Sequence, residues 1–575
     1  MSTQVSTKQK PPWFLSYLPI LQWLPQYQWK QWLTPDIIAG LTTWGVVIPS
    51  VIACASLAGM PPQTGLYAIL ASLLAYAIFG TSKQLVASAT QSSAVMLATT
   101  VLLFKPEDQS TYLVLAAAAV FIVGASFFLM GMLKLGFVAN FISRPVLEGF
   151  ISGLAIYILI KQIPKLLGFH GEGESAIDQL IYLLNNLGQT NFVAMAVGLV
   201  SLALFFVIPR ISARVPAGLV ILALGIIVTT VFGLAAYGMP IVGEVPAGLP
   251  SFSLPQLNPD DLATMVPAAL GIVLVIFSES LGAAKAIASR HGDEINPDQE
   301  MVAFGFANMG SSVLGGLPTG GSLSQSAAND GAGAKTPLAL VVAAAVSLIT
   351  VLWLTPLFTN LPSTVLAALI MYAMIHSIKV REMVNFFKIQ RVEFFLGMAA
   401  LLGVLFLDVL PGLLLAVILC LLIIIYASSR PHISVLGLVP GSRGVYRDIG
   451  YHPEARTIPG LLIFRLAGPI FYPNASLFAS NLKSLVAESD PPPTEIIIDM
   501  SANHRIDITS LEMLEKLKEE FEAKKIEFVV ADVHAPVKEI GLRSGLAKWA
   551  GKGMSFDTVE DAVQDYLARH PEGKT

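Results

Sequence analysis

Residues 80–93 read Gly-Thr-Ser-Lys-Gln-Leu-Val-Ala-Ser-Ala-Thr-Gln-Ser-Ser, and residues 315–327 read Gly-Gly-Leu-Pro-Thr-Gly-Gly-Ser-Leu-Ser-Gln-Ser-Ala. Both stretches are small and rich in hydroxyl groups, and each leads into an apolar block too short to cross a membrane, at 91–104 and 322–334. Polar backbone at membrane depth survives only where it is buried in protein or lines a cavity. These two broken segments therefore decide what kind of membrane fold the chain adopts.

The rest of the chain has the composition of a membrane protein. Of its 575 residues, 54% are hydrophobic and 13% are charged, whereas a soluble globular chain is about 25% charged. The net charge of −4 argues against a nucleic-acid partner. Cys54 and Cys420 lie in apolar stretches without metal-ligand spacing, so we expect no disulfide, no metal centre and no cofactor.

Uncharged stretches define the membrane segments. Residues 37–82 contain no charged side chain, which is enough for two spans of about 20 residues each, broken at Pro61 and Pro62. With the later blocks we count about fourteen segments. Seven per half is an odd number, so a second half built like the first would be inverted in the membrane. The later blocks lie at 91–104, 111–133, 144–160, 190–209, 216–235, 262–284, 298–314, 322–334, 336–358, 361–378, 392–407 and 410–428.

Charge placement predicts the orientation. With a cytoplasmic N-terminus, the loops on the inner side are rich in Lys and Arg, whereas the outer loops hold only Lys105, Lys161 and Lys165. The sequence therefore predicts a plasma (inner) membrane protein with both termini in the cytoplasm. Residues 1–35 lack the pattern of a signal peptide and are expected to be cytoplasmic or interfacial, in contact with membrane lipid. Four tryptophans suit that interface: Trp13, Trp23, Trp29 and Trp32.

The helix starts that follow the two quoted stretches indicate an anion site. A half-helix beginning at membrane depth points free N–H groups and the positive end of its dipole into a cavity. Two such ends form a midplane site in transporters built from inverted repeats. The alternative is that the small residues only let helices pack closely. The candidates are Ser88, Thr90, Gln91, Ser92 and Ser93 from the first stretch, and Ser322, Ser324, Gln325 and Ser326 from the second.

One carboxylate belongs to the same hypothesis. Glu279 lies in an otherwise apolar span, where an ionisable side chain is costly and is a functional candidate by default. It could bind a coupling H⁺ or Na⁺, or it could simply pair with a hydrogen-bond donor. Asp408 is close to the end of a span, where a solvated loop position is expected.

The chain changes character after Arg430 and reads as a soluble α/β domain. Strands alternating with helices predict a small sheet flanked by helices. We therefore divide the chain into an N-terminal segment at 1–35, a transmembrane transport domain at 36–430, a linker at 431–455 and an α/β domain at 456–575. The expected elements are strands at Leu461–Leu466, Glu495–Asp499 and Glu527–Ala531, and helices at Ser510–Lys524 and Val559–Arg569.

A set of short motifs resembles the sulfate permease (SulP) family over residues 35–555. The soluble part is similar to the STAS domain of that family through Asp499-Met-Ser501 and Ile506–Leu511. In the membrane part the resemblance rests on Asp36–Thr42, Ile48-Pro49, Ala53–Pro62, Gly65-Leu66-Tyr67, Gly80-Thr-Ser82, Ser143-Arg-Pro-Val146, Gly149-Phe150, Asn308, Gly315 and Ser322-Leu-Ser324.

The resemblance implies two inverted seven-segment repeats divided into core and gate domains, a cytoplasmic STAS domain and a homodimer. The third and tenth segments would each be a short strand followed by a half-helix, and transport would be elevator-like. By position, the pocket would be lined by Ser50 and Cys54 from the first segment, Thr90, Gln91 and Ser92 from the third, Glu279 from the eighth, and Ser324 and Gln325 from the tenth.

The sequence departs from the family pattern inside this pocket. Relatives often carry Gln in place of Ser50, and aromatic residues near Cys54 and at Thr90. Where relatives carry Arg in the tenth segment, this chain has Gln325, which removes a fixed positive charge beside the site. A coupled cation could supply that charge, so the departure favours cotransport with H⁺ or Na⁺ over simple exchange.

The STAS resemblance suggests a regulatory position. Thr509 falls where related anti-sigma factor antagonists carry a phosphorylated Ser, at the start of a helix, where a phosphate is electrostatically tolerable. A cytoplasmic regulatory partner would act there. The alternative is that Thr509 is an ordinary helix N-cap.

The leading interpretation is secondary active transport of a small inorganic anion, with sulfate as first choice and Na⁺-coupled bicarbonate as runner-up. An anion channel and an anion-sensing signalling protein with the STAS domain as output remain open. The eight His residues are scattered, and no nucleotide-binding loop or Ser-His-Asp pattern occurs. The sequence therefore does not indicate an enzyme.

Overall fold

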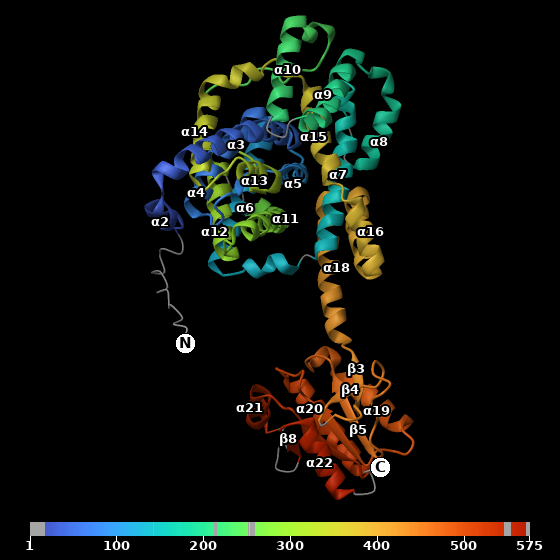
Figure 1. Ribbon diagram of the computed structural model, residues 1–575. Coiled ribbons are helices and arrows are strands. Elements are labelled where there is room, and N and C mark those ends of the chain that lie inside the picture. Colours follow the sequence, from blue (N-terminus) through green and yellow to red (C-terminus); the bar gives the residue numbers. More distant parts are fainter. Residues whose placement is uncertain are drawn as a thin grey trace. The chain divides into compact units, whose positions relative to one another are not determined.

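The computed structural model describes residues 18–141, 143–169, 171, 173, 175–211, 216–250, 252, 259–442, 444–545 and 554–570. Trp13 thus lies outside the described residues. The chain forms two compact units, Met1–Cys420 and Leu421–Thr575 (Figure 1). We refer to them as the membrane unit and the C-terminal unit and describe each by itself.

The membrane unit consists of apolar helices. Within the described part of the chain, nine helical segments are long and apolar enough to cross a membrane. Their presence confirms a polytopic α-helical membrane domain. The nine are Trp29–Leu57, Pro62–Phe79, Gln109–Met132, Arg144–Leu166, Phe192–Ile211, Pro259–His291, Leu338–Phe358, Ser363–Ile389 and Val409–Ser429.

The same order of elements occurs twice along the described chain, after a short helix α2 (Ile20–Trp23). Apart from α8 and α16, these elements give the seven segments expected of each half. The first half runs α3 (Trp29–Leu57), α4 (Pro62–Phe79), β1 (Val86–Ala89), α5 (Gln91–Leu102), α6 (Gln109–Met132), α7 (Arg144–Leu166), α8 (Ala176–Asn185), α9 (Phe192–Ile211) and α10 (Ala217–Phe232). The second runs α11 (Pro259–His291), α12 (Pro297–Val313), β2 (Thr319–Ser322), α13 (Leu323–Gly331), α14 (Leu338–Ile349), α15 (Ser363–Ser377), α16 (Val380–Ile389), α17 (Arg391–Leu407) and α18 (Val409–Ser429).

Two short strands relate the halves to each other. β1 and β2 pair antiparallel, with Val86 opposite Ser322 and Ala89 opposite Thr319. Each strand runs directly into its half-helix, so α5 and α13 leave this two-stranded ribbon at opposite ends. Because equivalent elements of the two halves run in opposite directions, the repeats are inverted. The two broken segments expected from the sequence are thus confirmed.

Helix packing separates two groups of elements. In the core, α12 packs against α4 and α6, and α3 packs against α14 (Figure 1). In the gate, α7 packs against α15 and α17. Small residues allow the closest approaches: a Cβ atom added to Gly149 of α7 would lie 2.0 Å from the carbonyl oxygen of Gly397 in α17. Such contacts are the usual way in which membrane helices pack closely.

The C-terminal unit is an α/β domain built on a six-stranded sheet of order β4-β3-β5-β6-β7-β8. Strands β5 to β8 are parallel, and β3 joins β4 and β5 antiparallel. One face buries Phe464, Phe478 and Phe521, and the other buries Ile497 and Tyr566. The elements are β3 (Ile433–Leu438), β4 (Tyr446–Asp448), β5 (Leu461–Leu466), α19 (Tyr472–Glu488), β6 (Glu495–Asp499), α20 (Ile508–Ala523), β7 (Glu527–Ala531), α21 (Ala535–Ser544), β8 (Ser555–Phe556) and α22 (Val559–Arg569).

The expected linker at 431–455 needs correction. These residues instead contain β3 and β4, which extend the sheet beyond β5. Both strands are short and are separated by Pro440 and glycines, a composition typical of loops. Only their pairing in the sheet, β3 with β5 and β4 with β3, reveals that they are strands.

Glu495 of β6 gives the C-terminal unit a predictable pH dependence. Burial raises the pKa of its carboxyl to about 7, although Arg569 lies 2.6 Å away and opposes the shift. A carboxyl with a raised folded-state pKa contributes stability below its unfolded pKa and loses it as the pH rises through the folded value. We expect the opening free energy of β6 amides to fall by roughly 1–3 kcal/mol between pH 4.5 and 8. Hydrogen exchange, corrected for intrinsic rates, measures this change.

The matched variant for that prediction is Glu495→Gln. Its side chain has the same shape and does not titrate, so we expect its β6 opening free energy to stay constant over the same pH range. If the β6 opening free energy of the wild type were as independent of pH as that of the variant, the raised pKa of Glu495 would be contradicted.

Candidate functional site

Gln325 of α13 connects three elements of the predicted site, namely α13 itself, β1 and α3. It lies in the first turn of α13 and is 3% exposed. Its Oε1 accepts a hydrogen bond of 2.5 Å from the Ser88 hydroxyl of β1, and its Nε2 donates to Ser50 Oγ of α3 at 3.2 Å. One uncharged amide therefore ties the second half-helix to the first strand and to the first long helix.

The start of α5 is fixed by a capping box. The backbone N–H of Ser93 donates to Thr90 Oγ1 at 3.3 Å, and that of Thr90 donates to Ser93 Oγ at 3.2 Å. This reciprocal pattern satisfies N–H groups that a helix start leaves unpaired. On α3, Cys54 donates from Sγ to the carbonyl oxygen of Ala89 at 3.6 Å, which places α3 beside the same helix start.

Glu279 of α11 also reaches this helix start. Both of its carboxylate oxygens lie within hydrogen-bond distance of Ser92 Oγ, at 3.0 and 2.8 Å. It forms no ion pair with any described residue. The site thus combines one carboxylate with hydroxyl and amide groups.

Two of the serine candidates serve the backbone instead. Ser93 donates from Oγ to the carbonyl oxygen of Pro318 at 3.0 Å, just before β2. Ser326 accepts from the backbone N–H of Val86 at 2.8 Å, at the start of β1. The two contacts are equivalent in the inverted repeats, and they fix each half-helix to the opposite strand. Such hydroxyls hold the ribbon in place rather than face a ligand.

The predicted site residues are brought together by the fold from α3, β1, α5, α11 and α13. Among them, Gln91 occupies the first turn of α5 and is half-buried, and Ser324 is exposed, 3.4 Å from Ser322 Oγ. These side chains are therefore the freest to meet a ligand. In the described part of the chain, no group of three or more His, Cys, Asp or Glu residues is arranged to hold a metal ion.

Sequence reasoning missed Glu300, which secures the chain segment leading into β1. This fully buried carboxylate of α12 accepts hydrogen bonds from the Tyr76 hydroxyl at 2.7 Å and from the Thr81 backbone N–H and hydroxyl at 2.8 and 2.6 Å. The rule that selected Glu279, an ionisable residue inside an apolar span, applies equally to Glu300. Its three donors indicate a structural role.

Asp36 performs a similar task for the second half. This buried side chain of α3 accepts from the backbone N–H groups of Lys335 and Thr336 at 2.7 and 3.1 Å and from the Thr336 hydroxyl at 2.7 Å. The segment between α13 and α14 is thereby attached to α3. The sequence motif that begins with Asp36 thus has a physical explanation.

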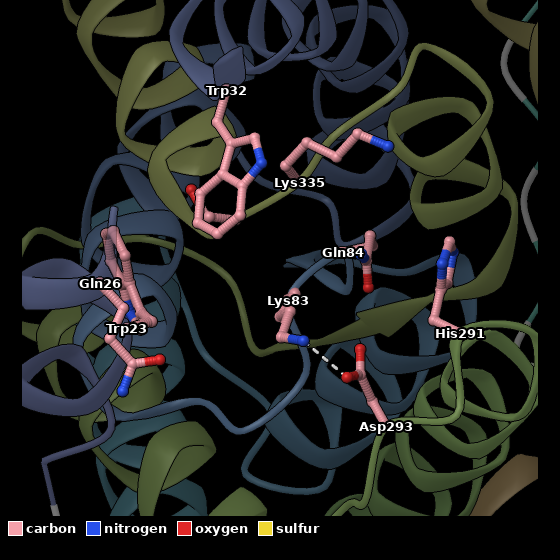
Figure 2. Close-up of a pocket in the computed structure, with 9 residues that line it drawn as sticks. Trp23, Gln26, Trp32, Lys83, Gln84, His291, Asp293 and Lys335 are labelled. Atoms are coloured by element: carbon pink, nitrogen blue, oxygen red, sulfur yellow. Dashed lines mark hydrogen bonds and ion pairs between the residues drawn. The ribbon is translucent and has the colours of Figure 1, made fainter. Parts of the chain in front are cut away.

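A cavity of about 310 Å³ lies elsewhere in the core (Figure 2). It is lined in part by Trp32, Lys83, Asp293 and Lys335, and Lys83 forms an ion pair of 2.6 Å with Asp293. None of the predicted site residues lines it. Its paired charges distinguish it from the site at the helix starts.

The position of Thr509 in the C-terminal unit corrects one alternative. The N-cap of α20 is Asp507, whose side chain accepts from the backbone N–H of Ser510 at 2.8 Å. Thr509 lies in the first helical turn and is exposed, so it is not the cap. Asp507 also accepts from the backbone N–H of Tyr472 at 2.6 Å, which joins the starts of α20 and α19.

Comparisons with known proteins cover both units. A family model described as Sulfate permease family matches residues 33–400, and one described as STAS domain matches residues 452–562. A probable sulfate transporter of Mycobacterium tuberculosis is 32% identical over 545 residues, which cover 95% of this chain and 97% of that protein. Sulfate transporter 4.1 of Arabidopsis thaliana, a chloroplastic protein, is 30% identical over 96% of this chain and 83% of its own length.

Solved structures show the same fold. The murine anion transporter Solute Carrier 26 family member A9, in its inward-facing state, superposes with a TM-score of 0.90 at 23% identity, over 99% of this chain and 96% of that chain. The transmembrane domain of the cyanobacterial bicarbonate transporter BicA superposes with a TM-score of 0.60 at 26% identity, over 67% of this chain and 97% of that chain.

Proposed function

We propose that this chain, which belongs to the sulfate permease family, carries sulfate across a membrane by secondary active transport coupled to H⁺ or Na⁺. Its family is one of transporters, so the chain is an anion transport protein and not an enzyme. Sulfate is the first choice of substrate because the relatives that match over nearly the whole chain carry that name.

One observation carries the coupling proposal: a carboxylate stands beside a helix start that suits an anion. The first turn of α5 offers its positive dipole end, while Ser92 of the same turn bonds to Glu279. A bound anion and an ionised Glu279 would repel each other in a site where water does not screen them. A proton or Na⁺ on Glu279 removes that repulsion, so the anion and the cation bind together and move together.

The substrate pocket in this proposal consists of Ser50 and Cys54 from α3, Thr90, Gln91 and Ser92 from α5, and Ser324 and Gln325 from α13. All belong to core elements, which supports an elevator-type movement of the core against the gate. We also propose that the protein is a homodimer in the inner membrane with both termini in the cytoplasm, and that a partner regulates it through phosphorylation at the exposed Thr509.

The test is uptake by purified protein in liposomes. We expect labelled sulfate to accumulate against its gradient when an inward H⁺ or Na⁺ gradient is imposed, and to equilibrate without one. Each gradient is imposed separately to identify the cation. Sulfate flux that no cation gradient can drive uphill would contradict coupled transport and would favour a channel.

A second candidate substrate is bicarbonate with Na⁺. The solved bicarbonate transporter domain that shares the membrane fold at 26% identity favours it. The same liposomes, loaded with a pH-sensitive dye, distinguish the two substrates. Na⁺-driven bicarbonate uptake that sulfate does not inhibit would identify bicarbonate, and not sulfate, as the substrate.

Gln325 offers a prediction about charge in the pocket. We expect Gln325→Arg to weaken the cation dependence of sulfate uptake, because a fixed guanidinium replaces part of the charge that the coupled cation supplies. The ratio of uptake with and without the cation gradient measures the effect. Gln325→Met, which has a similar length and no charge, separates loss of the Ser88 and Ser50 hydrogen bonds from gain of charge. An unchanged ratio in the Arg variant would count against the pocket assignment.

A further inference from the structure

A second cavity of about 310 Å³ lies between the core and the gate, away from the site at the helix starts. Its wall combines the end of α3, at Ser56, the turn before α4, the end of α7, at Lys165, residues 240–242, and the start of α15, at Ser363. Liquid water occupies about 30 Å³ per molecule, so the cavity has room for a small anion with several waters. The charge pattern of the loops places this end of the helices on the outer side.

Lys165 gives the cavity its charge. Its Nζ donates to Ser56 Oγ at 3.2 Å, a contact that joins the gate helix α7 to the core helix α3. No described residue forms an ion pair with it, and apart from Ser56 and Ser363 the other described lining residues are apolar or glycine. Because an ammonium in such surroundings lacks a counter-charge, the cavity favours an anion.

Two helix starts and two helix ends meet at the cavity, so helix dipoles add no net charge to its lining. The cavity is lined by Pro62 at the start of α4, which has 18 residues, and by Ser363 at the start of α15, which has 15. Each start carries the positive end of a helix dipole, and the ends of α3 and α7, at Ser56 and Lys165, carry negative ends that offset them. Among the described lining residues none is acidic, so the charge of this part of the lining comes from Lys165.

We propose that this cavity is an outer capture site for the inorganic anion that the protein transports, with Lys165 as its charged group. The proposal rests on the proposed function and adds a second binding position on the path. A cleft of one charge sign with apolar walls concentrates counter-ions and raises their association rate by about 10- to 1,000-fold. An anion held at Lys165 would await the movement that exposes the pocket to the outer side.

Lys165 also has a structural alternative. It lies in the last turn of α7, where a cation stabilises the helix through its dipole. That role would affect the stability of the protein and its transport from both sides equally. A capture site affects only anions that approach from the outer side. Kinetics measured separately from the two sides therefore distinguish the roles.

The experiment compares sulfate uptake by intact cells with uptake by inside-out vesicles, at low and high ionic strength. We expect Lys165→Met to raise the KM of uptake into cells by about tenfold at low salt while leaving the maximal rate and the KM in vesicles within twofold. Lys165→Arg keeps the charge and should retain the wild-type KM. Lys105→Met, another lysine on the expected outer side that does not line the cavity, is the matched control.

Each outcome has a meaning. Any of three results would overturn the capture site. The KM in cells with Lys165→Met could be unchanged, the KM could change equally in cells and in vesicles, or the KM of Lys165→Arg could be as high as that of Lys165→Met. A variant that fails to reach the membrane is replaced by Lys165→Gln, and protein amounts are measured in every case. Wild-type protein without sulfate uptake from either side would overturn the proposed function itself, and the capture site with it.

Discussion

Glu279→Gln is expected to abolish cation-driven accumulation of sulfate while sulfate still exchanges across the membrane. The amide has the shape of the carboxyl and can still accept a hydrogen bond from Ser92, so the helix start of α5 remains in place. It cannot bind a proton or attract Na⁺, so no cation is carried with the anion. Accumulation in liposomes with an imposed gradient measures the loss, and sulfate–sulfate exchange in the same liposomes measures the function that remains.

Two controls keep this prediction specific. Glu279→Asp retains an ionisable group and should keep part of the coupling, although its shorter side chain alters the contact with Ser92. Glu300→Gln changes the other buried carboxylate, which is held by Tyr76 and Thr81, and should reduce the amount of folded protein rather than the coupling. Wild-type accumulation by Glu279→Gln, with the same dependence on pH and Na⁺, would refute a coupling role.

The second large effect is expected at Gly149, where two gate helices touch. An added Cβ atom would meet the Gly397 carbonyl oxygen at 2.0 Å and its carbonyl carbon at 2.6 Å, and these are backbone atoms that cannot rotate away. We expect Gly149→Ala to destabilise the protein by about 3 kcal/mol or more, beyond the usual cost of an overpacked methyl group. Gly149→Leu should leave no folded protein. The yield of monodisperse protein in detergent and its unfolding temperature measure both.

Gly282 of α11 is the matched control. It also lies inside a helix, but an added Cβ atom meets no atom within 4 Å. Because Ala is a better helix former than Gly by about 1 kcal/mol, Gly282→Ala should unfold at the same or a higher temperature. Equal unfolding temperatures for the two variants would show that α7 and α17 can separate without cost.

The sequence by itself determined the class of fold. Runs of apolar residues without charge leave the backbone no partner in lipid except itself, so they must form helices. The hydroxyl-rich stretches at residues 80–93 and 315–327 interrupt the helices, and their polar backbone must be buried in protein or line a cavity because lipid offers it no partner. Local chemistry also placed the start of α5, since Thr90 and Ser93 lie within one helical turn and form the capping box with each other.

Local pattern also located three strands and two helices of the C-terminal unit: the expected bounds of β5, β6, β7 and α22 agree with the structure, and α20 overlaps the expected helix at Ser510–Lys524. It missed the strands β3, β4 and β8 and the helices α19 and α21. A short strand acquires its conformation from its neighbours in the sheet: β3 lies between β4 and β5, and the edge strand β4 pairs only with β3.

Only the tertiary structure decided which of the polar side chains could face a ligand. Ser93 and Ser326 look like Ser92 and Ser324 in the sequence, yet the first two bond to backbone groups more than 200 residues away. The sequence also cannot tell that Glu300 meets three donors whereas Glu279 meets one hydroxyl. A hydroxyl or a carboxylate takes its role from its partners, and long-range packing of the two inverted halves supplies those partners.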